Sequence, residues 1–191
     1  MSGVLVIFSG PSGVGKTTIT RAVIDRVADT QLSVSATTRP QRAKEVEGVD
    51  YFFVSRERFA EMEASGEMLE TARVFDNFYG TPAEWVREQM DAGKVVVLEI
   101  DVQGAILVKQ RMPDAFGIFI LPPSEEALLQ RLRDRKREPE DVIQRRFAEA
   151  KTEIAAARAS GAYDLFITND DLDRAIAEAV DAVETRRVGS A

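Results

Sequence analysis

The sequence predicts an α/β fold with a parallel sheet and helices on both of its faces. Short apolar runs typical of buried strands alternate along the chain with stretches of helical periodicity. Parallel strands need long crossovers between them, and the helices that supply those crossovers cover the sheet. The runs that we assign to strands of this sheet occupy residues 4–8, 95–100, 116–121 and 165–167.

Two segments interrupt this alternation. Residues 35–82 are rich in Thr, Arg, Tyr and Phe and alternate near 51–54 and 68–75, which predicts a small insert with its own strands. Residues 131–146 are dense in charge and contain no glycine. With 191 residues, of which 45% are apolar, the chain can bury one sizeable core. We therefore predict a single domain over 1–191, with its core in residues 1–34, 83–130 and 147–191.

The first predicted strand leads into a phosphate-binding loop. Residues 10–17 are Gly-Pro-Ser-Gly-Val-Gly-Lys-Thr, which fits the pattern G-x-x-x-x-G-K-[ST], and helical spacing follows. In this motif, characteristic of P-loop NTPases, backbone N–H groups converge on phosphate oxygens, Lys16 faces the β- and γ-phosphates, and Thr17 can hold Mg²⁺. A turn that merely capped a helix would leave the lysine unexplained. We assign triphosphate binding to Gly10, Pro11, Ser12, Gly13, Val14, Gly15, Lys16, Thr17 and Thr18.

Composition restricts the metal and the partners. The chain has no cysteine or histidine, which removes the usual zinc ligands and leaves oxygen ligands that suit Mg²⁺. Its formal net charge of −7 argues against general binding to nucleic acid or to an acidic membrane. Because there is also no long apolar run or lipidation pattern, a cytoplasmic location is the simplest expectation.

The insert carries two arginines suited to a second anion. Arg39 and Arg42 lie three residues apart beside hydroxyl groups, and Tyr51 follows nine residues after Arg42. One guanidinium group can bind two phosphate oxygens at once. This cluster can therefore hold a second anionic group facing the loop-bound triphosphate. A solvated basic turn is the alternative, because runs of charge usually face solvent.

Four motifs follow one another in a specific order. They are Ser-Ala-Thr-Thr-Arg at 35–39, Gly-Val-Asp-Tyr-Phe-Phe at 48–53, Asn-Phe-Tyr-Gly-Thr-Pro at 77–82 and Leu-Glu-Ile-Asp-Val-Gln-Gly at 98–104. With these motifs the chain closely resembles the guanylate kinase family, which transfers the terminal phosphate of ATP to GMP. The resemblance covers nearly the whole chain. It implies that residues 35–82 are a GMP-binding insert and that residues 131–146 are a lid.

The resemblance implies an acceptor site with a phosphate end and a guanine end. By this resemblance the GMP site comprises Ser35, Arg39, Arg42, Tyr51, Glu70, Tyr79, Thr81 and Asp101. A carboxylate such as Glu70 can accept both adjacent donors of guanine, N1–H and the N2 amino group, while Thr81 and Ser35 can donate to O6. Asp101 suits a place near guanine or in the Mg²⁺ water shell, whereas Glu99 is less certain. A helix cap or a solvated turn is the alternative for both acidic residues.

The donor side and the lid follow from the same resemblance. Arg131, Arg135 and Arg146 match lid arginines that close over the transferring phosphate, and Asn169 matches a position that contacts adenine. We expect Arg135 and Asn169 to bind ATP, and we assign catalysis to Lys16, Arg39, Arg135 and Arg146. A solvated helix face with ion pairs is the alternative for the basic run, and a helix cap is the alternative for Asn169.

The expected reaction is phosphorylation of GMP or dGMP by ATP with Mg²⁺. The GMP phosphate is largely dianionic at pH 7, with a second pKa of about 6, so the reaction needs positioning and charge neutralisation more than a general base. A related ribose 1,5-bisphosphate phosphokinase and a catalytically silent, peptide-binding module are the alternatives. Two departures from the family pattern stand out: Asp134-Arg135-Lys136 replaces Gly-Arg-Gly in the lid, and Asp76 replaces a glycine whose backbone angles the turn could require.

Overall fold

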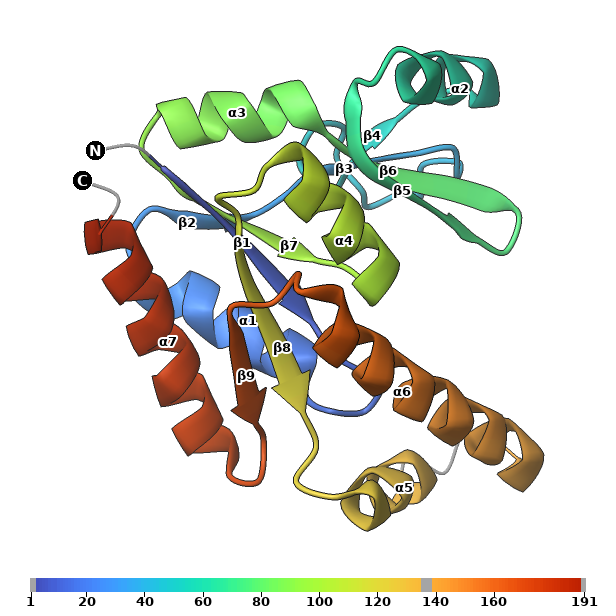
Figure 1. The fold of residues 1–191 in the computed structure, drawn as a ribbon. Coiled ribbons are helices and arrows are strands. Elements are labelled where there is room, and N and C mark those ends of the chain that lie inside the picture. The colour runs from blue at the N-terminus through green and yellow to red at the C-terminus, as the bar shows by residue number, and fades with distance from the viewer. Residues whose placement is uncertain (1–2, 135–138, 190–191) are drawn as a thin grey trace.

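The computed structural model describes residues 3–134 and 139–189, and it confirms the predicted α/β fold. Five parallel strands form the main sheet in the order β2-β7-β1-β8-β9 (Figure 1). They are β1 (Val4–Ser9), β2 (Thr30–Leu32), β7 (Val95–Glu99), β8 (Phe116–Leu121) and β9 (Leu165–Thr168). The carboxyl end of the central strand β1 lies where ligands collect in open α/β sheets.

Helices cover both faces of this sheet (Figure 1). Val4, Val6 and Phe8 of β1 pack in one buried cluster with side chains of α1 (Lys16–Arg26) and α7 (Leu172–Gly189). Leu5 and Ile7 belong to a second cluster, which includes side chains of α3 (Ala83–Asp91), α4 (Val102–Arg111) and α6 (Glu140–Ser160). Alternate residues of β1 thus supply two different cores, which explains why residues 4–8 are all apolar.

The insert forms a second sheet with one helix against it. Its strands β3 (Ser35–Thr37), β4 (Tyr51–Phe53), β5 (Met68–Val74) and β6 (Asn77–Pro82) have the order β4-β3-β6-β5. The helix α2 (Arg56–Ala64) contributes Phe59 to a small core with Ala36 and Met68. The insert therefore buries apolar surface of its own, apart from the two clusters on the main sheet.

The segment expected to form the lid belongs to two helices. Residues 131–134 end α5 (Glu125–Asp134), and residues 140–146 begin α6. Leu128 and Leu132 of α5 pack with Ile143 and Ala150 of α6 in a separate buried cluster. Between them, residues 135–138 lie outside the described part of the chain, so the predicted role of Arg135 and most of the Asp134-Arg135-Lys136 departure are not described.

The structure also contains elements that the sequence did not predict, namely β2, β3, β6 and α2. Strand β6 includes a glycine and a proline and resembles a turn in sequence, but it pairs with both β3 and β5. In the β5–β6 turn, the left-handed residue is Phe75, with φ of 54°, rather than Asp76. The backbone strain that we considered at Asp76 therefore falls on its neighbour. Among the described residues, no helix is long and apolar enough to cross a membrane.

Candidate active site

The phosphate-binding loop joins β1 to α1, as predicted. Gly15 stands at the start of α1 with a φ of 94°, which L side chains rarely adopt. A Cβ atom at Gly15 would lie 2.6 Å from Asn169 Nδ2, and that same amide donates a hydrogen bond to Val14 O at 2.7 Å. The Val14 side chain itself is buried in the core. Asn169 therefore braces the loop backbone at a helix N-terminus, where unpaired N–H groups favour anions.

A cavity of about 420 Å³ opens over the loop. Lys16 and Thr17 line it together with Glu99 from the end of β7. The Thr17 hydroxyl donates a hydrogen bond to Glu99 Oε1 at 2.6 Å, and Lys16 Nζ lies 3.5 Å from Gly10 O. Two kinds of oxygen ligand beside an ammonium group suit a magnesium-bound phosphate. The rest of the lining consists of Gly10, Pro11, Ser12, Gly13, Gly15, Thr18, Asp101, Val102 and Glu153.

Two further carboxylates face this cavity. Asp101 Oδ1 accepts a hydrogen bond from Gly104 N at 2.8 Å and caps α4, so the helix-cap alternative holds for Asp101 while its side chain still lines the site. Glu153 comes from α6 and was missed by the sequence analysis. Burial raises the pKa of Glu153, and the charge of Lys16 opposes that rise. Since Glu153 belongs to none of the motifs that we recognised, only the fold reveals it.

Arginines of the lid segment reach the phosphate-binding loop. Arg146 Nη2 donates a hydrogen bond to the hydroxyl of Ser12. Arg131 Nη2 donates to Asn169 O at 2.9 Å, next to the same loop. Leu132 also packs there, because a Cβ atom on Gly13 would lie 3.2 Å from its Cδ2 atom. The structure thus brings Arg131 and Arg146 to the loop from two different helices.

Asn169 lies beside a second, smaller cavity of about 340 Å³. This cavity is lined by Gly13, Val14, Gly15, Thr18, Arg131, Asn169, Asp170 and Leu172. Asn169 does not cap α7: Asp171 Oδ1 accepts the hydrogen bond from Arg174 N, at 2.9 Å, near the start of that helix. The helix-cap alternative for Asn169 is therefore wrong, and its side chain lies between the loop and the cavity.

The small sheet of the insert groups four of the eight residues predicted to bind GMP on one face. Ser35 pairs with Tyr51, and Thr37 pairs with Tyr79. Directly paired residues and alternate residues of a strand point to the same face, so Ser35, Tyr51, Tyr79 and Thr81 share it. The rings of Tyr51 and Tyr79 meet edge to face, with centroids 5.9 Å apart. The two tyrosines form an aromatic surface beside Arg39, to which the Tyr79 side chain is hydrogen-bonded.

Glu70 lies between this face of the small sheet and Asp101, which lines the cavity over the loop. Its side chain is buried, and Oε1 accepts a hydrogen bond from the Thr81 hydroxyl at 2.7 Å. A Cβ atom on Gly104 would lie 3.2 Å from Glu70 Oε2 and 3.5 Å from Asp101 Oδ1. Burial raises the pKa of Glu70, and the charge of Asp101 adds to the rise. The structure therefore brings Glu70 and Thr81, two of the residues predicted to bind guanine, together with Asp101 around the first turn of α4.

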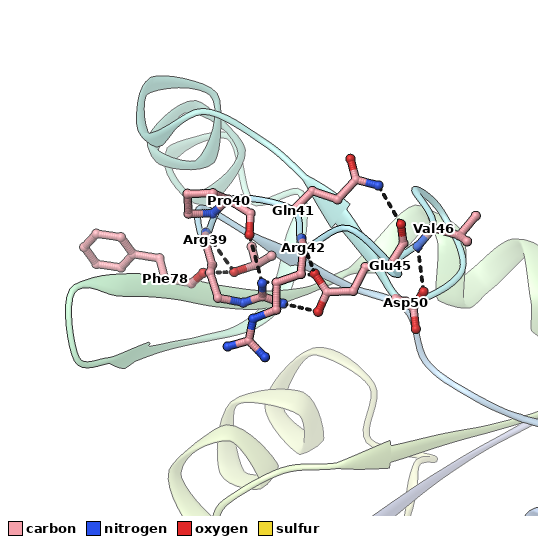
Figure 2. A network of polar contacts seen from close by, with 9 residues as sticks. Arg39, Pro40, Gln41, Arg42, Glu45, Val46, Asp50 and Phe78 are labelled. Carbon is pink, nitrogen blue, oxygen red and sulfur yellow. Dashed lines mark hydrogen bonds and ion pairs between the residues drawn. The ribbon is translucent and has the colours of Figure 1, made fainter.

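Arg39 is held by a carboxylate that the sequence analysis did not identify (Figure 2). Its Nη1 and Nη2 atoms donate to the two carboxylate oxygens of Glu45 at 3.0 and 2.7 Å. The guanidinium lies over the ring of Tyr51, with its Cζ atom 5.3 Å from the ring centroid. Figure 2 shows the guanidinium of Arg42 pointing away from the Glu45 carboxylate. The basic turn is thus an ordered ion-pair network and not merely a solvated run of charge.

Comparison with known proteins identifies the family. Residues 2–186 match the family model described as guanylate kinase. The guanylate kinase of Nostoc sp. is 49% identical over 92% of this chain and 87% of its own length, and that of Alcanivorax borkumensis is 44% identical over 99% and 90%. A crystal structure of guanylate kinase from Anaplasma phagocytophilum has a TM-score of 0.70 and 34% identity, covering 97% of this chain and 87% of that one. The chain therefore belongs to the guanylate kinase family.

Proposed function

We propose that this protein is a kinase that transfers the γ-phosphate of ATP to GMP, giving ADP and GDP. The observation that carries the proposal is the buried Glu70 carboxylate, which accepts from Thr81 and lies beside the cap of α4, next to the phosphate cavity. Burying a carboxylate costs free energy unless hydrogen-bond donors replace the water that it loses. Guanine supplies two adjacent N–H donors. Adenine N1 and cytosine N3 carry no proton, so neither base offers two adjacent N–H donors, and this carboxylate favours guanine.

The phosphate end of the acceptor site is supported by Arg39, Arg42, Tyr51 and Tyr79. Two guanidinium groups and two phenol hydroxyls can surround the acceptor phosphate and neutralise its charge. That phosphate is largely dianionic near neutral pH, and therefore it needs no general base to become a nucleophile. Its orientation toward the donor is the main contribution that these residues make to catalysis.

The donor end is supported by the loop, Lys16 and Arg146. Backbone N–H groups at the start of α1 and the Lys16 ammonium can hold the triphosphate while charge shifts during transfer. Arg146 lies on α6 and contacts Ser12 of the loop, so it can balance the charge on the transferring group. Asn169 and Arg131 border the smaller cavity, where we place the adenine of ATP.

Magnesium is the cofactor that this site fits. Thr17 would ligate the ion, and Glu99, which already accepts the Thr17 hydroxyl hydrogen bond, would hold its water shell. An ion held there would neutralise negative charge that develops during transfer. Asp101 lines the same cavity as Thr17 and Glu99, so oxygen atoms predominate around the proposed magnesium position.

A substrate panel tests the proposal directly. ADP release should be measured with ATP and Mg²⁺ against GMP, dGMP, AMP, CMP and ribose 1,5-bisphosphate. Turnover with GMP and dGMP alone supports the proposal. Preference for ribose 1,5-bisphosphate would identify the related phosphokinase, and no turnover with any acceptor would identify a binding module, although Lys16 and Thr17 argue against the last outcome.

A further inference from the structure

Glu45 sits at the centre of a polar network around the acceptor arginines. It accepts from Nη1 and Nη2 of Arg39, and its Oε2 atom also accepts from the backbone N–H of Arg42 at 2.8 Å (Figure 2). The side chains of Arg39 and Glu45 are only 13% and 18% exposed, so solvent weakens this pair less than a surface pair. One carboxylate thus contacts both arginines that we assign to the GMP phosphate.

The hydrogen bonds of Arg39 divide its five protons into two groups. Nη1 donates to Pro40 O at 2.8 Å as well as to Glu45, and Nη2 donates to the other Glu45 oxygen. None of these three hydrogen bonds uses Nε. Because the guanidinium is planar, Nε–H and the second Nη2 proton point in parallel along the adjacent Nε–Nη2 edge. Hydrogen bonding to Glu45, and less strongly to Tyr79, raises the pKa of Arg39.

The carboxylate is built into the turn that carries it. Glu45 N donates to Arg42 O at 3.0 Å, and the Gln41 side chain donates to Glu45 O at 2.7 Å. Hydrogen bonds from Arg39 and from the Arg42 backbone lower the pKa of Glu45, so it stays ionised across the physiological range. Moving Glu45 aside would leave the Arg42 N–H without this acceptor, which makes the carboxylate a fixed part of the site.

We propose that Glu45 is a positioning residue that fixes the plane of Arg39 and thereby aims the Nε–Nη2 edge, which Glu45 does not use, at the acceptor phosphate. This inference rests on the proposed GMP kinase activity. Glu45 binds one edge of the guanidinium, and the Tyr51 ring packs against one of its faces. The guanidinium therefore needs no reorientation when the phosphate binds. The charges of Arg39 and Arg42 both act on Glu45, so its carboxylate also offsets positive charge at this end of the site.

A competing arrangement would give the opposite result. If Glu45 merely occupied the place of the phosphate and had to leave before GMP bound, its removal would improve GMP binding. In the positioning arrangement, its removal frees the Arg39 side chain and weakens GMP use. The direction of the change in KM for GMP therefore separates the two.

Glu45→Gln tests the inference. Glutamine offers one acceptor oxygen in place of two, and its NH₂ group then meets an N–H donor of Arg39 or Arg42. We expect kcat/KM for GMP to fall about tenfold to a hundredfold, with the KM for ATP unchanged. Glu67→Gln is the matched control, since Glu67 forms a 2.7 Å ion pair with Arg58 elsewhere on the insert. Glu45→Asp, which keeps the charge but shortens the reach, should lie between Glu45→Gln and the unchanged protein.

A double-mutant cycle shows whether Glu45 acts through Arg39. If it does, adding Glu45→Gln to Arg39→Lys should cause less than a twofold further loss. Additive losses, unchanged kcat/KM in Glu45→Gln, or a lower KM for GMP would each overturn the inference. Failure of the unchanged protein to phosphorylate GMP would instead refute the proposed function. Circular dichroism and thermal melting of each variant identify any loss that comes from misfolding.

Discussion

Glu70 places a negative charge where little water reaches it. Its carboxylate is buried beside Thr81, and the neighbouring charge of Asp101 adds to the cost of ionisation. A protein that keeps such a group gives up stability unless a ligand uses the charge. At the scale of single residues, the guanine recognition that we propose for Glu70 and the stability of the fold therefore oppose each other.

The activity of Glu70→Gln measures how much Glu70 contributes to the use of GMP. The amide keeps one acceptor and points a donor at a guanine N–H, which should cost about 2 to 4 kcal/mol in kcat/KM for GMP. The KM for ATP should stay within twofold, because the donor contacts lie on the loop. Steady-state kinetics at pH 8 decides the matter, and a GMP efficiency within twofold of the unchanged protein would remove the guanine role from Glu70.

The stability of the same variant measures the burial term. Because the pKa of Glu70 is raised in the folded state, the folded protein binds this proton more tightly than the unfolded chain. Stability therefore decreases as the pH rises from the ordinary glutamate range through the raised value. Glu70→Gln should melt at a higher temperature than the unchanged protein at pH 8, and the difference should vanish near pH 4. A variant that melts lower at pH 8 would contradict the burial argument.

Lys16 is the residue whose loss should stop transfer while sparing acceptor binding. It lines the phosphate cavity, whereas the acceptor arginines belong to the insert. Lys16→Met should lower kcat by a factor of about 10² or more, because a cation aimed at developing charge is lost. GMP binding, measured by calorimetry without ATP, should stay near normal. Near-normal turnover in a folded variant would exclude the phosphate-loop mechanism.

At the scale of elements, the junction between β1 and α1 depends on Asn169. Gly15→Ala adds a Cβ atom 2.6 Å from the Asn169 amide at a φ of 94°. We expect a loss of about 1 to 3 kcal/mol of stability and a KM for ATP raised at least about tenfold, since the loop and Asn169 must separate.

Gly161→Ala is the matched control for that substitution. Gly161 ends α6 with a φ of 66°, and a Cβ atom there would meet nothing within 4 Å. It should lose about 1 kcal/mol of stability through backbone strain alone, with unchanged kinetics. If both variants had the same KM for ATP, contact with Asn169 would not explain the effect of Gly15→Ala.

At the scale of the whole molecule, we propose that residues 35–82 and 131–146 act as units that approach each other when both nucleotides bind. Figure 1 shows the insert and the α5–α6 pair on opposite sides of the end of β1. Arg146 already contacts Ser12, so most of the travel should belong to the insert. Closure excludes water and so limits wasteful hydrolysis of ATP.

Small-angle scattering tests this closure. The radius of gyration should decrease when a bisubstrate analogue joining adenosine and guanosine through phosphates is added. An ATP analogue alone should produce less than half of that change, because it leaves the acceptor arginines unoccupied. An unchanged radius with the bisubstrate analogue would count against large closure.

Sequence reasoning was most successful where the signal is local. Four of the five strands of the main sheet, the phosphate-binding loop and the family motifs all lie in contiguous runs, so their spacing is visible in the chain. It failed for β6, because pairing with two neighbours overrides the turn preference of its glycine and proline. It also missed Glu45 and Glu153, whose chemistry depends on which side chains the fold places beside them.

The sequence by itself determined that this chain forms an α/β kinase of the guanylate kinase family, with its phosphate loop at the end of the first strand. Only the tertiary structure decided how the site is assembled. Thr17 meets Glu99 across 82 positions and Asn169 meets Val14 across 155. Such contacts follow from strand order and register, in which a shift of one residue would turn a side chain to the other face. The spacing of residues along the chain does not reveal that register, so these contacting partners can be identified only from the folded structure.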